Sequence, residues 1–278
     1  MKKLICLSVI VMGLLLVSCE KSSDSQVEKK NESAGLLEKA RQFSKQHDQL
    51  VLQMMELDKE LLRKGVSSAI GSAGGRLREQ VLQVVFQVTG IKPEIADPGS
   101  QKVLQASSGD PGYFWVSLDT DAISLAPYAE SSTGLQFLGS VDDLVEDQNL
   151  SLEEKLDRLE LLSTEAANNT QLGTAEMERV LTTIEVLKGS LQLWSGFPEQ
   201  APSLSPAQGL MKVSIRDWSR WKKLGFVAAA DAVGGALGFF LGGYIVVNGV
   251  PVYLPAGPTG LAGTAAALSF IAAKMVGW

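Results

Sequence analysis

The sequence predicts a mainly α-helical protein, with a helical bundle or coiled-coil-like body followed by a glycine-rich hydrophobic helical hairpin. Three observations predict this fold class. Apolar residues follow a heptad pattern over residues 35–64, helix caps precede apolar stripes within 151–196, and glycines recur at every fourth position in a nearly uncharged C-terminal segment. The chain has 278 residues, which suits two folded regions together with processing segments.

The first predicted helix covers about residues 35–64 and ends near Gly65. Its apolar seam alternates steps of four and three residues, which is the coiled-coil spacing, although the same stripe serves an ordinary bundle helix. We favour a bundle within the chain over pairing with a second copy. Residues 66–88 continue with helical spacing, weakened by glycines, so residues 35–91 form one helical region. The seam residues are Leu36, Ala40, Phe43, His47, Leu50, Met54, Leu57 and Leu61.

The middle of the chain divides into a loop-rich segment and a helical hairpin. Residues 92–150 begin with Pro, Gly, Ser and Asp in high density, and they contain a strand-like stretch near Tyr113 and an acidic run that we assign to solvent. In the 151–196 segment, Ser151 and Glu154 have the spacing of a capping box. Two antiparallel helices joined by a short polar turn are therefore expected there.

A Pro-rich linker at 197–215 leads to the C-terminal segment, residues 216–278. Residues 224–247 are almost entirely apolar or small and are long enough to cross a bilayer of about 30 Å. A second helix is expected from Leu261 to about Val276, after an uncharged turn. The glycine spacing resembles the glycine zippers of membrane-associated bacterial proteins, which implies close helix packing. The expected packing residues are Gly234, Gly238, Gly242 and Gly263.

Charges and indoles at the ends of this hairpin predict how it meets lipid. Cations and aromatic side chains near its start are the residue types found at lipid headgroups, and an antiparallel return places the last residue beside them. Asp231 and Lys274 lie at comparable distances from the turn, so we expect an ion pair between them inside the membrane. The expected interface residues are Trp218, Trp221, Lys222, Lys223 and Trp278.

The N-terminus carries the pattern of an export signal. Lys2 and Lys3 precede an apolar stretch, residues 4–17, that is shorter than the roughly 20 residues of a spanning helix. Leu16-Val17-Ser18-Cys19 resembles the lipobox of bacterial lipoproteins. The resemblance implies removal of residues 1–18 and lipid attachment to Cys19. Residues 19–34 are polar and are predicted to form a flexible tether. Glu20, the residue after the cysteine, favours location at the outer membrane over the inner membrane.

Several function classes are disfavoured by composition. A net charge of −6 without basic clusters argues against nucleic-acid binding. His47 is the one histidine, and removal of Cys6 and modification of Cys19 leave no free thiol, so the usual zinc sites and nucleophilic triads lack their residues. Asp119 and Asp121 are better explained as a polar turn than as metal ligands. We therefore expect no enzyme and no cofactor apart from the lipid on Cys19.

The predicted function is a structural or interaction role in the cell envelope, with a C-terminal hairpin that assembles through its zipper or inserts into lipid. Membrane lipid and other copies of the chain are the expected partners. The alternative is a membrane-active, bacteriocin-like or pore-forming antagonist, whose helical hairpin with an uncharged tip permeabilises a target bilayer. A carboxylate-dependent hydrolase using Asp119 and Asp121 is the third reading.

Overall fold

The computed structural model describes residues 2–64, 73–95, 114–118, 123–197, 218–237, 242–247, 250–255 and 260–278. The chain is mainly helical, which confirms the predicted fold class. The helices are α1 (Lys2–Arg63), α2 (Ala73–Thr89), α4 (Ser132–Glu146), α5 (Leu152–Ala167), α6 (Thr174–Ser195), α7 (Arg220–Leu237) and α8 (Gly260–Val276), with a 3-10 turn η2 (Ala126–Tyr128) before α4.

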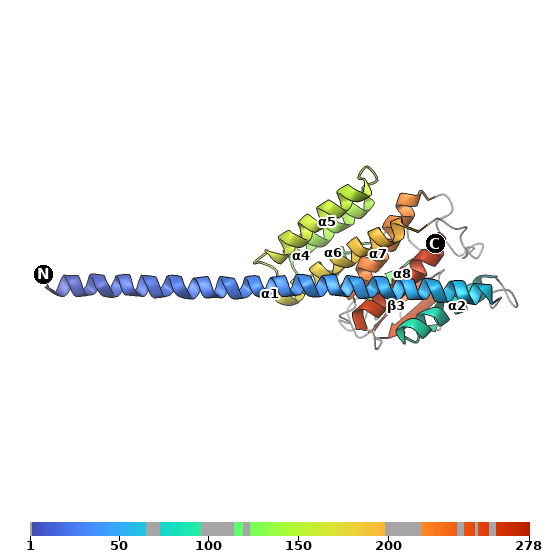
Figure 1. The fold of residues 1–278 in the computed structure, drawn as a ribbon, viewed down its shortest axis with the longest axis horizontal. Helices are drawn as coiled ribbons and strands as arrows, with labels where there is room; N and C mark the ends of the chain where they lie inside the picture. The colour runs from blue at the N-terminus through green and yellow to red at the C-terminus, as the bar shows by residue number, and fades with distance from the viewer. Residues whose placement is uncertain are drawn as a thin grey trace.

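Helices α1, α6, α7 and α8 form the central bundle, in which α1 and α7 each pack against both α6 and α8. Helix α5 packs on α6, α4 packs on α7, and α2 turns back along α1 to reach α8. In Figure 1, α1 continues well past this body toward the N-terminus. The two ends of α1 therefore lie in different surroundings, one packed in the bundle and one outside it.

The heptad-patterned helix is a bundle helix of the same chain, as favoured from the sequence. Its innermost stripe is rotated from the predicted seam, because α1 contacts both α6 and α8 and is buried over a broader face. Leu36, Leu50 and Leu57 are only half-buried. The fully buried positions on α1 are Ala40, Ser44, His47, Val51, Met54, Met55 and Asp58.

Two segments predicted to lack helix are helical. Residues 19–34, expected to be a flexible tether, belong to α1, because their Glu, Lys and Gln are good helix formers that extend a helix already begun. The loop-rich segment 92–150 contains α4. Its N-cap Ser131 accepts a hydrogen bond from the Gly134 N–H. The missed signal was an apolar face between the acidic residues, formed by Phe137, Leu138, Val141 and Leu144.

The predicted hairpin at 151–196 is confirmed as α5 and α6. Ser151 and Glu154 form the expected capping box, each side chain bonding the backbone N–H of the other. Helix α6 is buried along most of its 22 residues and on more than one side, since α1, α5 and α7 all pack against it. It is the central helix of the body.

The C-terminal segment differs most from its prediction. The helix expected at 224–247 ends at Leu237, and β3 (Gly242–Val247) and β4 (Val250–Pro255) form an antiparallel hairpin in place of the uncharged turn. Tyr, Ile and Val residues favour strand there. The sheet order is β1-β4-β3-β2, with β1 (Glu94–Ile95) antiparallel to β4 and the strand-like stretch β2 (Phe114–Ser117) parallel to β3.

The zipper is therefore shorter than predicted. Gly242 begins β3 and does not share a helix face with Gly234, and Gly238 lies outside the described residues. The second helix is confirmed as α8, in which Gly263 is buried. A Cβ added at Gly234 would lie 2.5 Å from the Ala265 Cα, so glycine is required for the close approach of α7 and α8 at this point.

Candidate functional site

Four of the buried ionisable side chains connect α1 to the C-terminal helices: His47 and Asp58 on α1, Asp231 on α7 and Lys274 on α8. Each is at most 5 % exposed. A buried charge without a partner is strongly destabilising, so such groups occur in pairs. The structure arranges these four as two pairs, and each pair joins α1 to one helix of the C-terminal segment.

The first pair joins α1 to α7. His47 Nε2 lies 3.7 Å from Asp231 Oδ2, an ion-pair distance, and His47 Nδ1 is 2.9 Å from Asp48 Oδ1. Burial disfavours the imidazolium, but attraction to the Asp231 and Asp48 carboxylates outweighs it and raises the pKa of His47 to about 9. His47 is therefore a cation at neutral pH, set between two carboxylates.

Asp231 is held by hydroxyls as well as by His47. Burial raises the pKa of Asp231, while attraction to His47 and hydrogen bonds from Ser190 and Ser269 oppose that rise. The Trp194 indole N–H donates to Ser269 Oγ at 3.0 Å, and the Trp194 ring stacks on Trp278. A polar network thus runs from α1 through α7 to α6 and α8, inside an apolar core.

The second pair joins α1 to α8 and to α2. Lys274 Nζ lies 2.7 Å from Asp58 Oδ2, and Gln80 Nε2 on α2 donates to Asp58 Oδ1 at 3.0 Å. His47 and Asp58 are eleven residues apart, about three helical turns, so both project from one face of α1. That face packs on α8 and reaches α7 through the pair of His47 and Asp231.

The predicted ion pair between Asp231 and Lys274 is wrong. Gly234 meets Ala265 where α7 and α8 touch; Asp231 lies three residues before Gly234, whereas Lys274 lies nine after Ala265. In antiparallel helices this leaves the two charges about six residues, or roughly 9 Å, apart along the axes. Lys274 pairs with the Asp58 carboxylate on α1, and Asp231 pairs with the His47 imidazole on α1.

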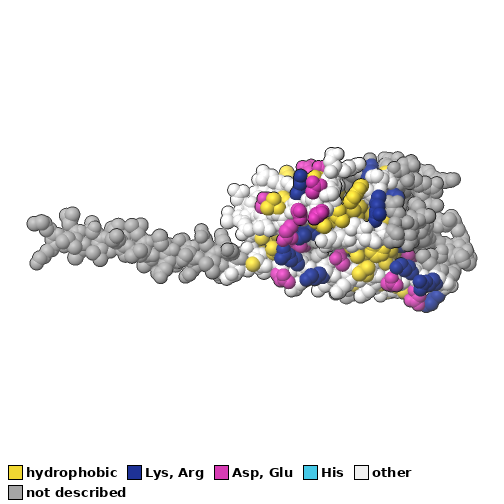
Figure 2. All heavy atoms as spheres, turned by 45° about the horizontal axis from the view of Figure 1, so that its top comes forward, with side chains coloured by type: hydrophobic (Ala, Val, Ile, Leu, Met, Phe, Trp, Pro, Cys, Tyr) yellow, Lys and Arg dark blue, Asp and Glu magenta, His cyan; other side chains and the backbone are white. Residues whose placement is uncertain are grey.

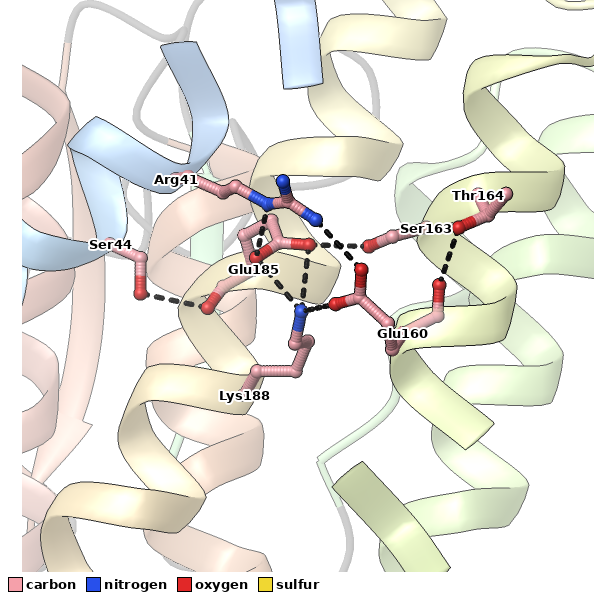
Figure 3. Close-up of polar contacts among 7 residues, drawn as sticks. All are labelled: Arg41, Ser44, Glu160, Ser163, Thr164, Glu185 and Lys188. Atoms are coloured by element: carbon pink, nitrogen blue, oxygen red, sulfur yellow. Dashed lines mark hydrogen bonds and ion pairs between the residues drawn. The ribbon is translucent and has the colours of Figure 1, made fainter. Parts of the chain in front are cut away.

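A second polar cluster joins α1, α5 and α6 nearer the surface (Figure 3). Glu185 on α6 accepts hydrogen bonds from Ser163 at 2.7 Å and from Lys188 at 3.1 Å. Arg41 Nη2 reaches Glu160 Oε1 at 2.7 Å, and Lys188 also pairs with Glu160. Two cations and two carboxylates balance in this cluster. It therefore fastens α1 to α5 and α6 in the same way as the buried pairs fasten α1 to α7 and α8.

The predicted membrane-interface residues are dispersed. Trp221 is 45 % exposed, and Lys222 Nζ lies 4.6 Å from the centre of the Trp218 ring. Lys223 is buried, and Trp278 is enclosed against Trp194 instead of joining a surface belt. Among the helices that the structure describes, none is both long and apolar enough to cross a membrane.

The Ser, His and Asp side chains of the buried network lack the arrangement of a nucleophilic triad. The Ser190 hydroxyl donates to Asp231 and not to the imidazole of His47, and all three groups are closed off from solvent. Within the described ranges, no cluster of His, Cys, Asp and Glu could hold a metal ion, and Asp119 and Asp121 lie outside those ranges. The contacts of this buried network can hold α1, α6 and α7 in fixed positions relative to one another.

The pairing of His47 with Asp231 was not predicted from the sequence, in which the two residues lie 184 positions apart. The available signal was that each is a lone ionisable group on an otherwise apolar helix face, so each needed a partner of opposite charge.

Compared with known proteins, the chain matches no family model, no curated protein and no solved structure.

Proposed function

We propose that the protein is a lipid-anchored protein of the cell envelope, in which a helical body with a structural or interaction role is carried on a helical stalk. Lipid on Cys19 is the anchor, and the outer membrane is the favoured site. The C-terminal segment is part of this body, and its small residues pack within the chain.

One observation supports this proposal above the others. Helix α1 is continuous from Lys2 to Arg63, so the lipobox cysteine and the buried side chains of the bundle belong to the same helix. Cys19 lies 21 residues before Ala40, which is the first buried position among residues 31–64, a distance of about 30 Å along a helix. An anchor on Cys19 would therefore hold the body away from the bilayer surface.

The surface of the body suits a water-exposed setting. Acidic and basic side chains alternate over the face drawn in Figure 2, with apolar side chains in small separate groups. Such a mixed surface is typical of a folded domain in water. The burial of α8 from Ala262 to Val276 supports a core role for the C-terminal segment over insertion in the resting state.

Labelling and extraction test the proposal. Cells that express the chain are fed radioactive palmitate, and we expect label in the parent and in Cys6→Ala, the matched control, but none in Cys19→Ala. A Cys19→Ala chain is also exported by a non-lipoprotein signal sequence, and the membranes are extracted with carbonate. We expect this chain in the supernatant and not in the membrane pellet. Label on Cys19→Ala, or retention of that chain in the pellet, would contradict a lipid-only anchor.

A membrane-active antagonist is the second candidate, supported by the composition of α8. That helix carries one charge, Lys274, and is apolar or small on every side, which is typical of a core helix or of a membrane-associated one. Dye release from liposomes tests it: the chain from residue 19 onward should release dye, and Gly234→Leu, which blocks the approach of α7 to α8, should abolish release. No release from the parent chain counts against this candidate.

A further inference from the structure

We propose that α1 is a detachable strap that packs on α8 and reaches Asp231 of α7 through His47, and that its departure lets the α7–α8 unit bind a lipid bilayer. This inference rests on the proposed envelope location, where a bilayer is at hand. It concerns regulation of the C-terminal segment, which the bundle covers in the closed state.

The covered unit is unusually apolar for a protein in water. Every residue of α8 from Ala262 to Val276 is buried, as are residues 223–236 of α7. Between residues 224 and 236 of α7, Asp231 is the only charge. If α1 leaves, an apolar face of α8 becomes exposed together with the surroundings of Asp231 on α7, and an exposed apolar face in water favours burial in lipid.

The attachment of α1 to this unit is made partly by charge. The interior charges on α7 and α8 are neutralised by His47 and Asp58, both of which α1 supplies. A third polar contact of the buried face of α1 holds it to α6: Ser44 donates to the Glu185 carbonyl at 2.8 Å. Buried polar contacts specify register strongly but add less net stability than apolar packing. The two ion pairs therefore specify how α1 docks, alongside the apolar packing of side chains such as Val51 and Met54.

Chain order also favours separation of α1. It is the first helix, and it joins the rest of the described body only through its C-terminal end, toward α2. If α1 leaves, the loops that join α4, α5, α6, α7 and α8 and the packing among these helices can stay in place. The heptad pattern of α1 permits several apolar registers, and the two ion pairs select one of them. Loss of one pair should therefore loosen α1 before the other helices.

The test uses the chain from residue 19 onward with Cys19→Ala in every sample, so that its outcome does not depend on lipidation. Asp58→Asn removes the partner of Lys274. The matched control is Glu60→Gln, which removes an exposed pair with Lys64 on the same helix. The measurements are amide hydrogen exchange by helix and co-sedimentation with vesicles of phosphatidylethanolamine and phosphatidylglycerol.

For Asp58→Asn we expect exchange in α1 and α8 to rise at least tenfold while α5 stays protected, with several-fold more protein bound to vesicles. Glu60→Gln should match the parent. Asp58→Asn with Lys274→Met removes both charges; it should restore protection and lower vesicle binding, even though α8 is then more apolar.

Equal loss of protection in all helices, opening without vesicle binding, or vesicle binding by the double variant that equals that of Asp58→Asn would each overturn the strap. These results are separate from the palmitate experiment. If Cys19 takes no label, the envelope proposal fails while the opening of α1 is still measured.

Discussion

His47 on α1 and Asp231 on α7 face each other inside the bundle, with Nε2 and Oδ2 3.7 Å apart and both side chains fully enclosed. The proposed anchor lies on one of these helices, and the segment that resembles a glycine zipper begins on the other. Their pairing connects α1, which carries the proposed stalk, to the C-terminal helices. A change in the charge of either residue should therefore weaken the attachment of α1 to these helices.

The stability of the protein should fall as pH rises through about 9. The pKa of His47 is raised from 6.5 to about 9 by its two carboxylate neighbours, which exceed the opposing effect of burial. A raised pKa contributes stability that is complete below about 6.5 and is lost as pH rises through 9. The loss should be on the order of 2 to 3 kcal/mol. Urea unfolding at pH 6.5 and 9.5 measures it.

His47→Gln is the control for this pH dependence. It cannot take up a proton, so its free energy of unfolding should change little over the same interval. A parent protein whose stability is flat between pH 6.5 and 9.5, or a His47→Gln variant that keeps the full decline, would show that another group is responsible.

The sequence predicted the elements whose signals are local. The hairpin of α5 and α6 follows from a cap at Ser151 and apolar stripes within each helix, and the structure has both. The strands β3 and β4 pair with each other across a short turn, but residues 242–247 continue the apolar stretch that begins at residue 224, and a short apolar run can form either a strand or part of a buried helix. Their outer partners are distant in the chain: β3 pairs with residues 114–117 and β4 with residues 94–95. Strand pairing of this kind leaves little trace in the sequence of one segment.

The site was predicted only in part, for the same reason. A partner for Asp231 was required by its charge, and Lys274 was chosen because the two residues lie at comparable distances from the predicted turn. The actual partner, His47, lies on the first helix, and its distance from Asp231 depends on how α1 docks. Docking geometry arises from the packing of several helices and cannot be derived from the periodicity of one.

Gly234→Ala should destabilise the protein by about 2 kcal/mol or more, because the added Cβ overlaps the Ala265 backbone and forces α7 and α8 apart. Gly139→Ala is the matched control: that glycine lies within α4 with no atom within 4 Å of the added Cβ. There alanine should stabilise by up to about 1 kcal/mol through helix propensity. Thermal unfolding monitored by circular dichroism compares them, and equal effects would count against close packing at Gly234.

Trp278→Ala should cost about 3 to 5 kcal/mol, the usual range for a large buried aromatic side chain. Trp278 is 2 % exposed and stacks on Trp194 with ring centres 5.7 Å apart. Trp221→Ala removes a half-exposed indole and should change the unfolding free energy by less than about 1 kcal/mol. Urea unfolding of both variants tests whether Trp278 belongs to the core or, as its sequence position suggested, to a membrane interface. Equal small effects would restore the interface assignment.

A double-mutant cycle on His47 and Asp231 separates their interaction from the cost of removing either one. Asp231→Asn leaves a buried imidazolium with Asp48 as its remaining carboxylate partner, and His47→Gln leaves a buried carboxylate held by hydroxyls; we expect each to cost about 3 kcal/mol. The double variant leaves no stranded charge, so it should cost clearly less than the sum, with a coupling energy above about 1 kcal/mol. Free energies of unfolding at pH 7 give the cycle. Additive losses would mean that the two groups, although 3.7 Å apart, do not stabilise each other, and α1 would then be held to α7 by apolar packing alone.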